Sequence, residues 1–361
     1  MAQYTGKKLE IATDYICNYI QNNHLAQGDR LPTEKQLVED TGLSRITLRR
    51  ALSNLQEKGM ISSIQGSGYF VGSSYQAIKT DSLPMVVSYG HNSSRILDMV
   101  QGAQVFLDSV HCRLNVTVTG RNPNNEKEAI EELYRTGARC AIVLPVSSED
   151  NCDFYFHMIQ SGMNLVFVDR KPTGITCCDL VQSDNMTGGY LTTKHLIEQG
   201  HTRIAVFGLE PLTHTSTIGE RYAGYRYAML EHGLALPEKS YFYAQYQRRS
   251  PDIDELFSPS SGITAVCAIN DFAATDLIRH AREHGLKVPR DFSITGFDNL
   301  DISHQFIPPI TTVDQPFSDL GCIAAEIAYQ YLSGTNNGYT TRLLPVQLIV
   351  RDSTAPHVLS R

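Results

Sequence analysis

The chain has 361 residues, of which 42% are hydrophobic and 19% charged, and its formal net charge is −7. That length exceeds one ordinary domain and predicts a small unit joined to a larger body. No apolar run could cross a membrane, no signal peptide is recognisable, and the eight cysteines form no C-x-x-C pair, so we expect a soluble, cytoplasmic protein with reduced thiols.

The first element in chain order is an amphipathic helix expected over residues 7–23. Its apolar side chains recur every three or four residues, at Leu9, Ala12, Ile16 and Ile20. A short second helix is expected from Thr33 as N-cap to its stop at Gly42. A third helix begins after Ser44, ends at Gly59 and has a regular apolar stripe, formed by Leu48, Ala51, Leu52 and Leu55.

The pair of helices separated by a glycine turn is typical of a helix-turn-helix. The opposite face of the third helix bears Arg45, Thr47, Arg49 and Arg50, where a recognition helix would meet the major groove and its phosphates. Two short strands are expected at 61–64 and 69–71, joined by a glycine-rich tip that could approach a DNA backbone as a wing. For any single arginine of the third helix, an ordinary solvated surface residue is the alternative interpretation.

Three sequence stretches make this region resemble the winged helix of the GntR family of bacterial repressors over residues 1–73. They are LPTE, LSR-x-T-x-R-x-AL and Q-G-x-G-x-F-V. The resemblance implies phosphate contacts at the N-terminus of the first helix of the motif, base or phosphate contacts from the recognition helix, and a minor-groove contact from the wing. The residues concerned are Thr33 and Glu34, then Arg45, Thr47 and Arg49, then Gln65 and Gly66.

The net charge is unevenly distributed. Residues 1–73 contain eight Lys and Arg against seven Asp and Glu, a net of +1, whereas the remainder contains 23 against 31, a net of −8. A near-neutral DNA-binding module makes few phosphate contacts, so tight binding is expected to need two modules on one site. The sequence therefore predicts a homodimer on double-stranded operator DNA.

A polar linker is expected over residues 74–84, followed by alternating strands and helices over 85–361. The expected strands are mostly apolar throughout, and they fall into two βα series. The predicted fold class is α/β: a winged helix-turn-helix (α+β) plus a two-lobed, periplasmic-binding-protein-like body with doubly wound parallel sheets. Lobe 1 would comprise about 85–183 and 315–340, and lobe 2 about 184–314 and 341–361.

Polar side chains follow several of the expected strands, where ligands bind in such folds. They include Arg95, Asp169, Asn270 and Asp298, and Arg221 lies near the start of a helix. Carboxylates, amides and a guanidinium that meet in a cleft suit a polyhydroxylated ligand. Asp and Asn after a strand can also simply cap the next helix, which is the preferred interpretation of Asp271.

From about Met85 to the C-terminus the chain resembles the LacI/GalR family of sugar-responsive repressors. The matching stretches include SDN-x-x-GG, HLIEQGHTRIA, R-x-x-GY, GLKVPRDFSITGFDN and PPITTVDQP. The resemblance implies effector contacts from Asp169, Arg221, Asn270, Asp298 and Gln315. The chain also departs from the LacI/GalR pattern, since a GntR-type winged helix replaces that family's own helix-turn-helix and hinge helix. This combination resembles the arabinose-repressor type of bacterial regulator.

An enzyme is not expected. His280 and His284 match the H-x-x-E-H order of some zinc proteases, but no third ligand is indicated. No cofactor or metal is predicted. The expected function is a transcriptional repressor of a carbohydrate operon, released by a small carbohydrate. A nucleobase or an anionic sugar is an alternative effector, with Arg95, Arg248 and Arg249 near the cleft mouth, and a sugar-binding protein for transport or chemoreception is the alternative class.

Overall fold

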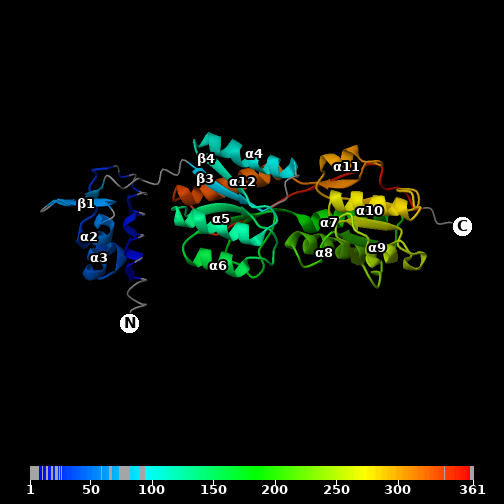
Figure 1. Ribbon diagram of the computed structural model, residues 1–361, viewed down its shortest axis with the longest axis horizontal. Coiled ribbons are helices and arrows are strands. Elements are labelled where there is room, and N and C mark those ends of the chain that lie inside the picture. The colour runs from blue at the N-terminus through cyan, green and yellow to red at the C-terminus, as the bar shows by residue number, and fades with distance from the viewer. Residues whose placement is uncertain are drawn as a thin grey trace. The chain divides into compact units, whose positions relative to one another are not determined.

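The computed structural model describes residues 8–9, 11–13, 15–17, 19–20, 23, 25, 27–57, 59–64, 67–72, 82–88, 94–336 and 338–357. The chain forms two compact units that divide between residues 81 and 82. The helices and strands of both units are labelled in Figure 1. No helix among these residues is long and apolar enough to cross a membrane.

The first unit is a winged helix-turn-helix, as predicted. Residues between 8 and 20 are helical, and the side chains of Ala12, Ile16 and Ile20 among them are buried in the core of this unit. Helices α2 (Glu34–Thr41) and α3 (Arg45–Glu57) follow, and strands β1 (Ile61–Ile64) and β2 (Gly68–Val71) form an antiparallel hairpin. The apolar stripe of α3 is buried in the core of this unit.

Local hydrogen bonds set the ends of α2 and the start of α3. The Thr33 hydroxyl accepts from the Gln36 amide, and the Gln36 side chain accepts from the Thr33 amide, which completes a capping box. Gly42 ends α2 with a φ of 65°, a left-handed conformation that favours glycine. The Ser44 hydroxyl accepts from the Thr47 amide at 3.2 Å, so the predicted caps at Thr33, Gly42 and Ser44 are confirmed.

The first lobe of the second unit is built on a six-stranded parallel sheet in the order β13-β7-β6-β5-β3-β4. Its strands are β3 (Ser82–Val87), β4 (Arg113–Val118), β5 (Cys140–Leu144), β6 (Asn164–Val168), β7 (Asp179–Ser183) and β13 (Thr341–Leu344). Helices α4 (Ser94–Ser109) and α12 (Phe317–Leu332) cover one face, and α5 (Pro123–Arg135) and α6 (Cys152–Gln160) cover the other (Figure 1). Apolar cores on both faces explain why these strands are hydrophobic throughout.

The second lobe has a four-stranded parallel sheet in the order β11-β10-β8-β9. Its strands are β8 (Ile204–Gly208), β9 (Tyr241–Tyr243), β10 (Ala265–Ala268) and β11 (Ser293–Thr295). Its helices are α7 (Asn185–Glu198), α8 (Ser216–Glu231), α9 (Pro251–Leu256), η1 (Pro259–Ser261), α10 (Asp271–Glu283) and α11 (Asp301–Gln305). The two predicted parallel-sheet lobes are therefore confirmed.

The chain passes between the lobes three times. It enters the second lobe after β7, returns to α12 after β12 (Thr312–Asp314), and crosses again between β13 and β14 (Gln347–Ile349). Strands β12 and β14 pair antiparallel and form the hinge. Figure 1 shows the return, since the orange α12 packs beside the cyan α4 in the first lobe.

Two expected boundaries need correction. Residues 82–84, assigned to the linker, belong to β3, where Pro84 lies in register with Asn115. Residues 341–344, assigned to lobe 2, form β13 and pair with β7 in the sheet of the first lobe. The rest of the expected linker, residues 74–81, lies outside the described residues.

The packing of α4 on α12 gives a first testable prediction. A Cβ atom on Gly102 would lie 1.8 Å from the Ser318 carbonyl oxygen, and one on Gly321 would lie 1.8 Å from the Met99 carbonyl oxygen. Gly321→Ala should therefore force the helices apart and lower the free energy of unfolding by about 3 kcal/mol, the upper part of the overpacking range.

Urea unfolding of the full chain measures this loss. Gly219→Ala in helix α8 is the matched control, because a Cβ there would lie 4.0 Å from its nearest neighbour, the Leu212 carbonyl oxygen. That control should be neutral or slightly stabilising, since alanine favours helix. Equal stability of the two variants would contradict the close α4–α12 approach.

Candidate functional site

The first candidate site is the exposed face of α3 in the winged helix-turn-helix. Arg45, Arg49 and Arg50 are exposed there, and Thr47 is half-buried. The Arg49 Nε donates to both oxygens of Glu34, at 3.1 and 3.0 Å. Helix α2 therefore fixes the direction of one recognition-helix arginine.

Two of the expected DNA contacts already have local roles. Thr33 completes the capping box of α2, and Glu34 pairs with Arg49. A carboxylate repels phosphate, so this pairing favours a positioning role for Glu34 over the phosphate contact that the resemblance implies. Gln65 and Gly66 of the expected wing contact lie outside the described residues.

The second candidate site is the region between the lobes around Asp298, the expected ligand cleft. The Asp298 Oδ1 accepts from Gln315 Nε2 at 2.6 Å and lies 3.4 Å from Arg221 Nη1. Asp298 follows β11, Gln315 follows hinge strand β12, and Arg221 is on α8. Three of the residues predicted from sequence are thus brought together.

Several contacts hold the Arg221 guanidinium in place. Its Nε donates to the Asn185 Oδ1 at 2.9 Å, and its Nη1 donates to the Ile269 carbonyl at 2.6 Å. The guanidinium lies 3.7 Å from the centroid of the Phe297 ring, which favours the cation. The side chain is a fixed donor, because its contacts leave little conformational freedom to lose on binding a ligand.

The backbone of the cleft is strained at three non-glycine residues. Asp169 has a φ of 68°, Asp298 of 99° and Asn299 of 48°. Positive φ values are uncommon for residues with a Cβ, and such strain clusters at ligand sites. The carboxylates of both lobes are therefore placed by turns that the folded structure maintains at an energetic cost.

The Asp298 carboxyl has a raised pKa of about 6. Burial is the largest cause, the Arg221 charge opposes it, and the Asp169 charge adds to it. Asp271 is completely buried nearby, and burial together with the charge of Asp298 raises its pKa to about 7. Both carboxyls therefore change charge close to neutral pH.

These raised pKa values predict a dependence of stability on pH. An unfolded aspartate loses its proton near pH 4, whereas folded Asp271 keeps its proton up to about pH 7. The folded state binds more protons in that window, so the contribution of Asp271 to stability falls as pH rises from 4 to 7. Asp271→Asn removes this titration, and its stability relative to the wild type should rise across the window.

Chemical unfolding at half-unit pH steps tests this prediction. Asp254→Asn is the control, because Asp254 is an exposed residue paired with His284. A stability difference between Asp271→Asn and the wild type that stays constant from pH 4 to 7 would refute the buried titration.

Asn270 and Asp271 have partners other than those predicted. Asn270 caps α10, because its Oδ1 accepts from the Ala273 amide at 2.8 Å. The cap was expected at Asp271, but that carboxylate instead accepts from the Leu300 amide and the Thr312 hydroxyl. The effector contact expected of Asn270 stays a prediction, with its amide NH₂ group as the remaining donor.

Arg95 bridges the two lobes. Its Nη1 lies 3.1 Å from Asp98, its Nη2 lies 3.5 Å from Asp314, and it donates to the Asn299 carbonyl. Asp169 lies beside Arg170, with 3.4 Å between the carboxylate and Nε. Arg95 is therefore already neutralised by carboxylates, whereas the Asp169 charge reaches Asp298 across the cleft.

Three further residues, Gln182, Asn185 and Glu220, were not predicted from the sequence as ligand candidates. The Glu220 carboxylate accepts from Gln182 Nε2 at 3.2 Å and from Asn185 Nδ2 at 3.1 Å, and burial raises its pKa. Asn185 belongs to the SDN stretch and Glu220 immediately precedes Arg221. Their place in or beside these motifs was the available sequence signal for Asn185 and Glu220. Only the fold brings Gln182, Asn185 and Glu220 together.

Direct hydrogen bonds also join the lobes at loops away from the hinge. The Ser216 amide donates to the Ser148 hydroxyl at 2.7 Å, and the Ser148 amide donates to the His214 carbonyl at 3.1 Å. The Lys171 amide donates to the Ser216 hydroxyl at 3.0 Å. The described conformation is therefore one in which the lobes touch.

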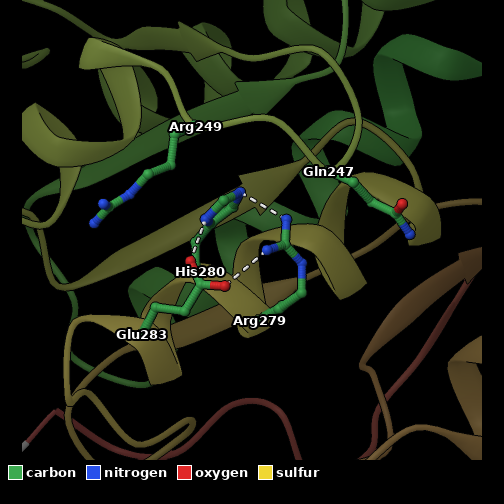
Figure 2. A pocket seen from close by; sticks show the side chains of 5 residues that line it. All are labelled: Gln247, Arg249, Arg279, His280 and Glu283. Atoms are coloured by element: carbon green, nitrogen blue, oxygen red, sulfur yellow. Dashed lines mark hydrogen bonds and ion pairs between the residues drawn. The ribbon is translucent and has the colours of Figure 1, made fainter.

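A separate surface cavity of about 360 Å³ lies on the second lobe, beside α10. Figure 2 shows Gln247 and Arg249 on the loop that faces α10, which supplies Arg279, His280 and Glu283. His280 accepts from Arg279 and donates to Glu283, while His284 pairs with Asp254. Arg249 thus lines this cavity, and the expected place of Arg248 and Arg249 at the cleft mouth stays a prediction.

Comparisons with known proteins place both units. Residues 10–71 match the model of bacterial regulatory proteins of the gntR family, and residues 193–354 match that of a periplasmic binding protein-like domain. The arabinose metabolism transcriptional repressor of Geobacillus stearothermophilus is 28% identical over 94% of this chain and 95% of its own length.

Two further similarities concern parts of the chain. The HTH-type transcriptional regulator DegA of Bacillus subtilis is 36% identical over 49% of this chain and 52% of its own length. The solved structure of a LacI family transcriptional regulator from Mycobacterium smegmatis is 26% identical, with a TM-score of 0.66 over 76% of this chain and 99% of that structure.

The fold and these similarities define a DNA-binding transcriptional regulator, not an enzyme. The chain joins a GntR-type winged helix-turn-helix to an effector domain of the LacI type, which has the periplasmic-binding-protein fold. This composite architecture is the one predicted from the sequence.

Proposed function

We propose that this regulator represses a carbohydrate-utilisation operon and is released from its operator by a small neutral sugar bound between the lobes. The observation that supports a sugar most directly is the set of hydrogen-bonding groups around Asp298. Relatives named for arabinose metabolism and for a ribose operon agree with this choice. Two copies of the chain would bind one operator as a homodimer.

Hydrogen-bond acceptors predominate in the cleft. Asp169, Glu220 and Asp298 contribute carboxylates, and the Oε1 atoms of Gln182 and Gln315 are buried without a hydrogen-bond partner among the described residues. A buried acceptor without a donor is unfavourable, so these atoms favour a ligand that supplies several hydroxyl donors. Arg221 would donate to a hydroxyl or ring oxygen of the same ligand.

The charges favour a neutral effector over an anionic one. Arg95 is paired with Asp98 and Asp314, and Arg249 lines the separate cavity. The remaining carboxylates would repel a phosphate or carboxylate group that entered the cleft. The anionic alternative therefore has less support than a pentose or hexose.

Release would follow from a change in how the lobes meet. The cross-lobe bonds of Ser148 with Ser216 and of Arg95 with Asn299 belong to one lobe geometry. A ligand that binds one lobe geometry better than another shifts the population toward it. Strand β3 begins at Ser82, just after the boundary between the units, and ends near the cleft, so a shift of the first lobe would displace the start of that strand.

Thermal unfolding with a panel of neutral sugars, sugar phosphates and nucleobases tests the proposal. A ligand that binds only the folded protein raises the unfolding midpoint by mass action. We expect a shift with one neutral pentose or hexose. A shift only with phosphorylated sugars or nucleobases would contradict the neutral-sugar assignment.

A further inference from the structure

The exposed face of recognition helix α3 has one apolar residue among polar ones. Ile46 is 72% exposed, whereas the other exposed residues of the helix are Arg45, Arg49, Arg50, Ser53, Asn54, Gln56 and Glu57. A single exposed isoleucine is common on protein surfaces, so exposure alone would indicate nothing. The position of Ile46 on the helix is the observation that indicates a role.

Helix geometry puts Ile46 at the centre of the exposed face. An α-helix turns about 100° per residue, and the buried stripe of Leu48, Ala51, Leu52 and Leu55 defines the inner side of α3. By this periodicity Ile46 lies almost diametrically opposite the middle of the stripe. Arg49 and Arg50 lie one turn further along, on either side of it.

The charges of Arg49 and Arg50 indicate what this face would contact. Their charge suits phosphates or guanine edges, and the face is at the N-terminal half of the second helix of a helix-turn-helix, which enters the major groove. The residue at the centre of such a face points toward the floor of the groove. Ile46 must then lie against base edges.

We propose that Ile46 recognises the 5-methyl group of a thymine in each half-site of the operator. Thymine is the base that presents an apolar group in the major groove. The other base edges present donors or acceptors that isoleucine would desolvate without replacing their hydrogen bonds. Ile46 therefore favours thymine at one position and disfavours the other bases there. The inference rests on DNA binding, and it is independent of the nature of the effector.

The test replaces thymine by deoxyuracil, a change that removes only the methyl group. Binding sites are first enriched from random duplex DNA with the full-length protein. Each thymine of the enriched site is then replaced in turn, and dissociation constants are measured by fluorescence anisotropy at one fixed salt concentration. We expect one position per half-site at which the replacement weakens binding about fourfold, the effect of one buried methyl group.

The same substitutions with Ile46→Ala decide the assignment. The deoxyuracil penalty at that position should disappear in Ile46→Ala and persist largely in Ile46→Val. It should also persist in the control Ile64→Ala, which truncates an isoleucine of the wing that is 55% exposed.

A penalty of equal size in Ile46→Ala and the wild type would overturn the proposal, as would an enriched site without thymine. Loss of the penalty in Ile64→Ala instead would assign the methyl contact to the wing. If no sequence is enriched, the DNA-binding function fails and the thymine contact fails with it. Absence of a sugar response would contradict the proposed effector and would leave this result standing.

Discussion

Asp298→Asn shifts the response to the effector to much higher concentrations and leaves operator binding intact. The substitution keeps the size of the side chain, and asparagine tolerates the positive φ of 99° at this position better than alanine does. It replaces one carboxylate oxygen by an NH₂ group and removes the charge near Arg221 and Gln315. We expect effector affinity to fall by about 100-fold, as for the loss of a buried charged hydrogen bond.

Calorimetric titration of the effector into each variant measures this loss. Asp254→Asn makes the same chemical change at an exposed position of the second lobe and should bind normally. Retained affinity in Asp298→Asn, within about threefold of the control, would mean that the carboxylate does not contact the ligand.

Arg49→Ala weakens operator binding and leaves effector binding unchanged. The guanidinium is presented from α3 and is oriented by Glu34. Loss of one such contact costs about 1–3 kcal/mol, and a dimer loses two of them, so the dissociation constant should rise by about 100-fold.

Arg135→Ala is a closely matched control for that measurement. The Arg49 side chain is 66% exposed and pairs with Glu34, and the Arg135 side chain is 68% exposed and pairs with Glu132 in the first lobe. Gel retardation at constant salt should separate the two variants. An undiminished affinity of Arg49→Ala for operator DNA would refute the recognition-helix assignment.

Local sequence signals predicted the parts of the structure that depend on neighbouring residues. The caps at Thr33 and Gly42, the apolar stripe of α3 and the hairpin after it all arise from interactions within a few residues. The convergence of Arg221, Asp298 and Gln315 was implied by family motifs, and the geometry agrees with it.

Features that depend on distant pairing could not be predicted in the same way. Strand β13 joins β7 across more than 150 residues of sequence, so nothing within TRLL indicates the lobe to which it belongs. Asn270 and not Asp271 caps α10, because the Asp271 carboxylate accepts from the Leu300 amide and from the hydroxyl of Thr312 in the hinge. Likewise, the contact of Glu220 with Gln182 requires the two lobes to meet.

Sugar-dependent release of DNA is tested most directly by adding sugar to the complex of the full-length protein with its enriched DNA site. Fluorescence anisotropy of the labelled DNA is followed while one neutral sugar identified by thermal unfolding is titrated. We expect the DNA to be released from the wild type and retained by Asp298→Asn at the same sugar concentration. DNA that stays bound to the wild type at saturating sugar, or is released equally from both proteins, would contradict this expectation.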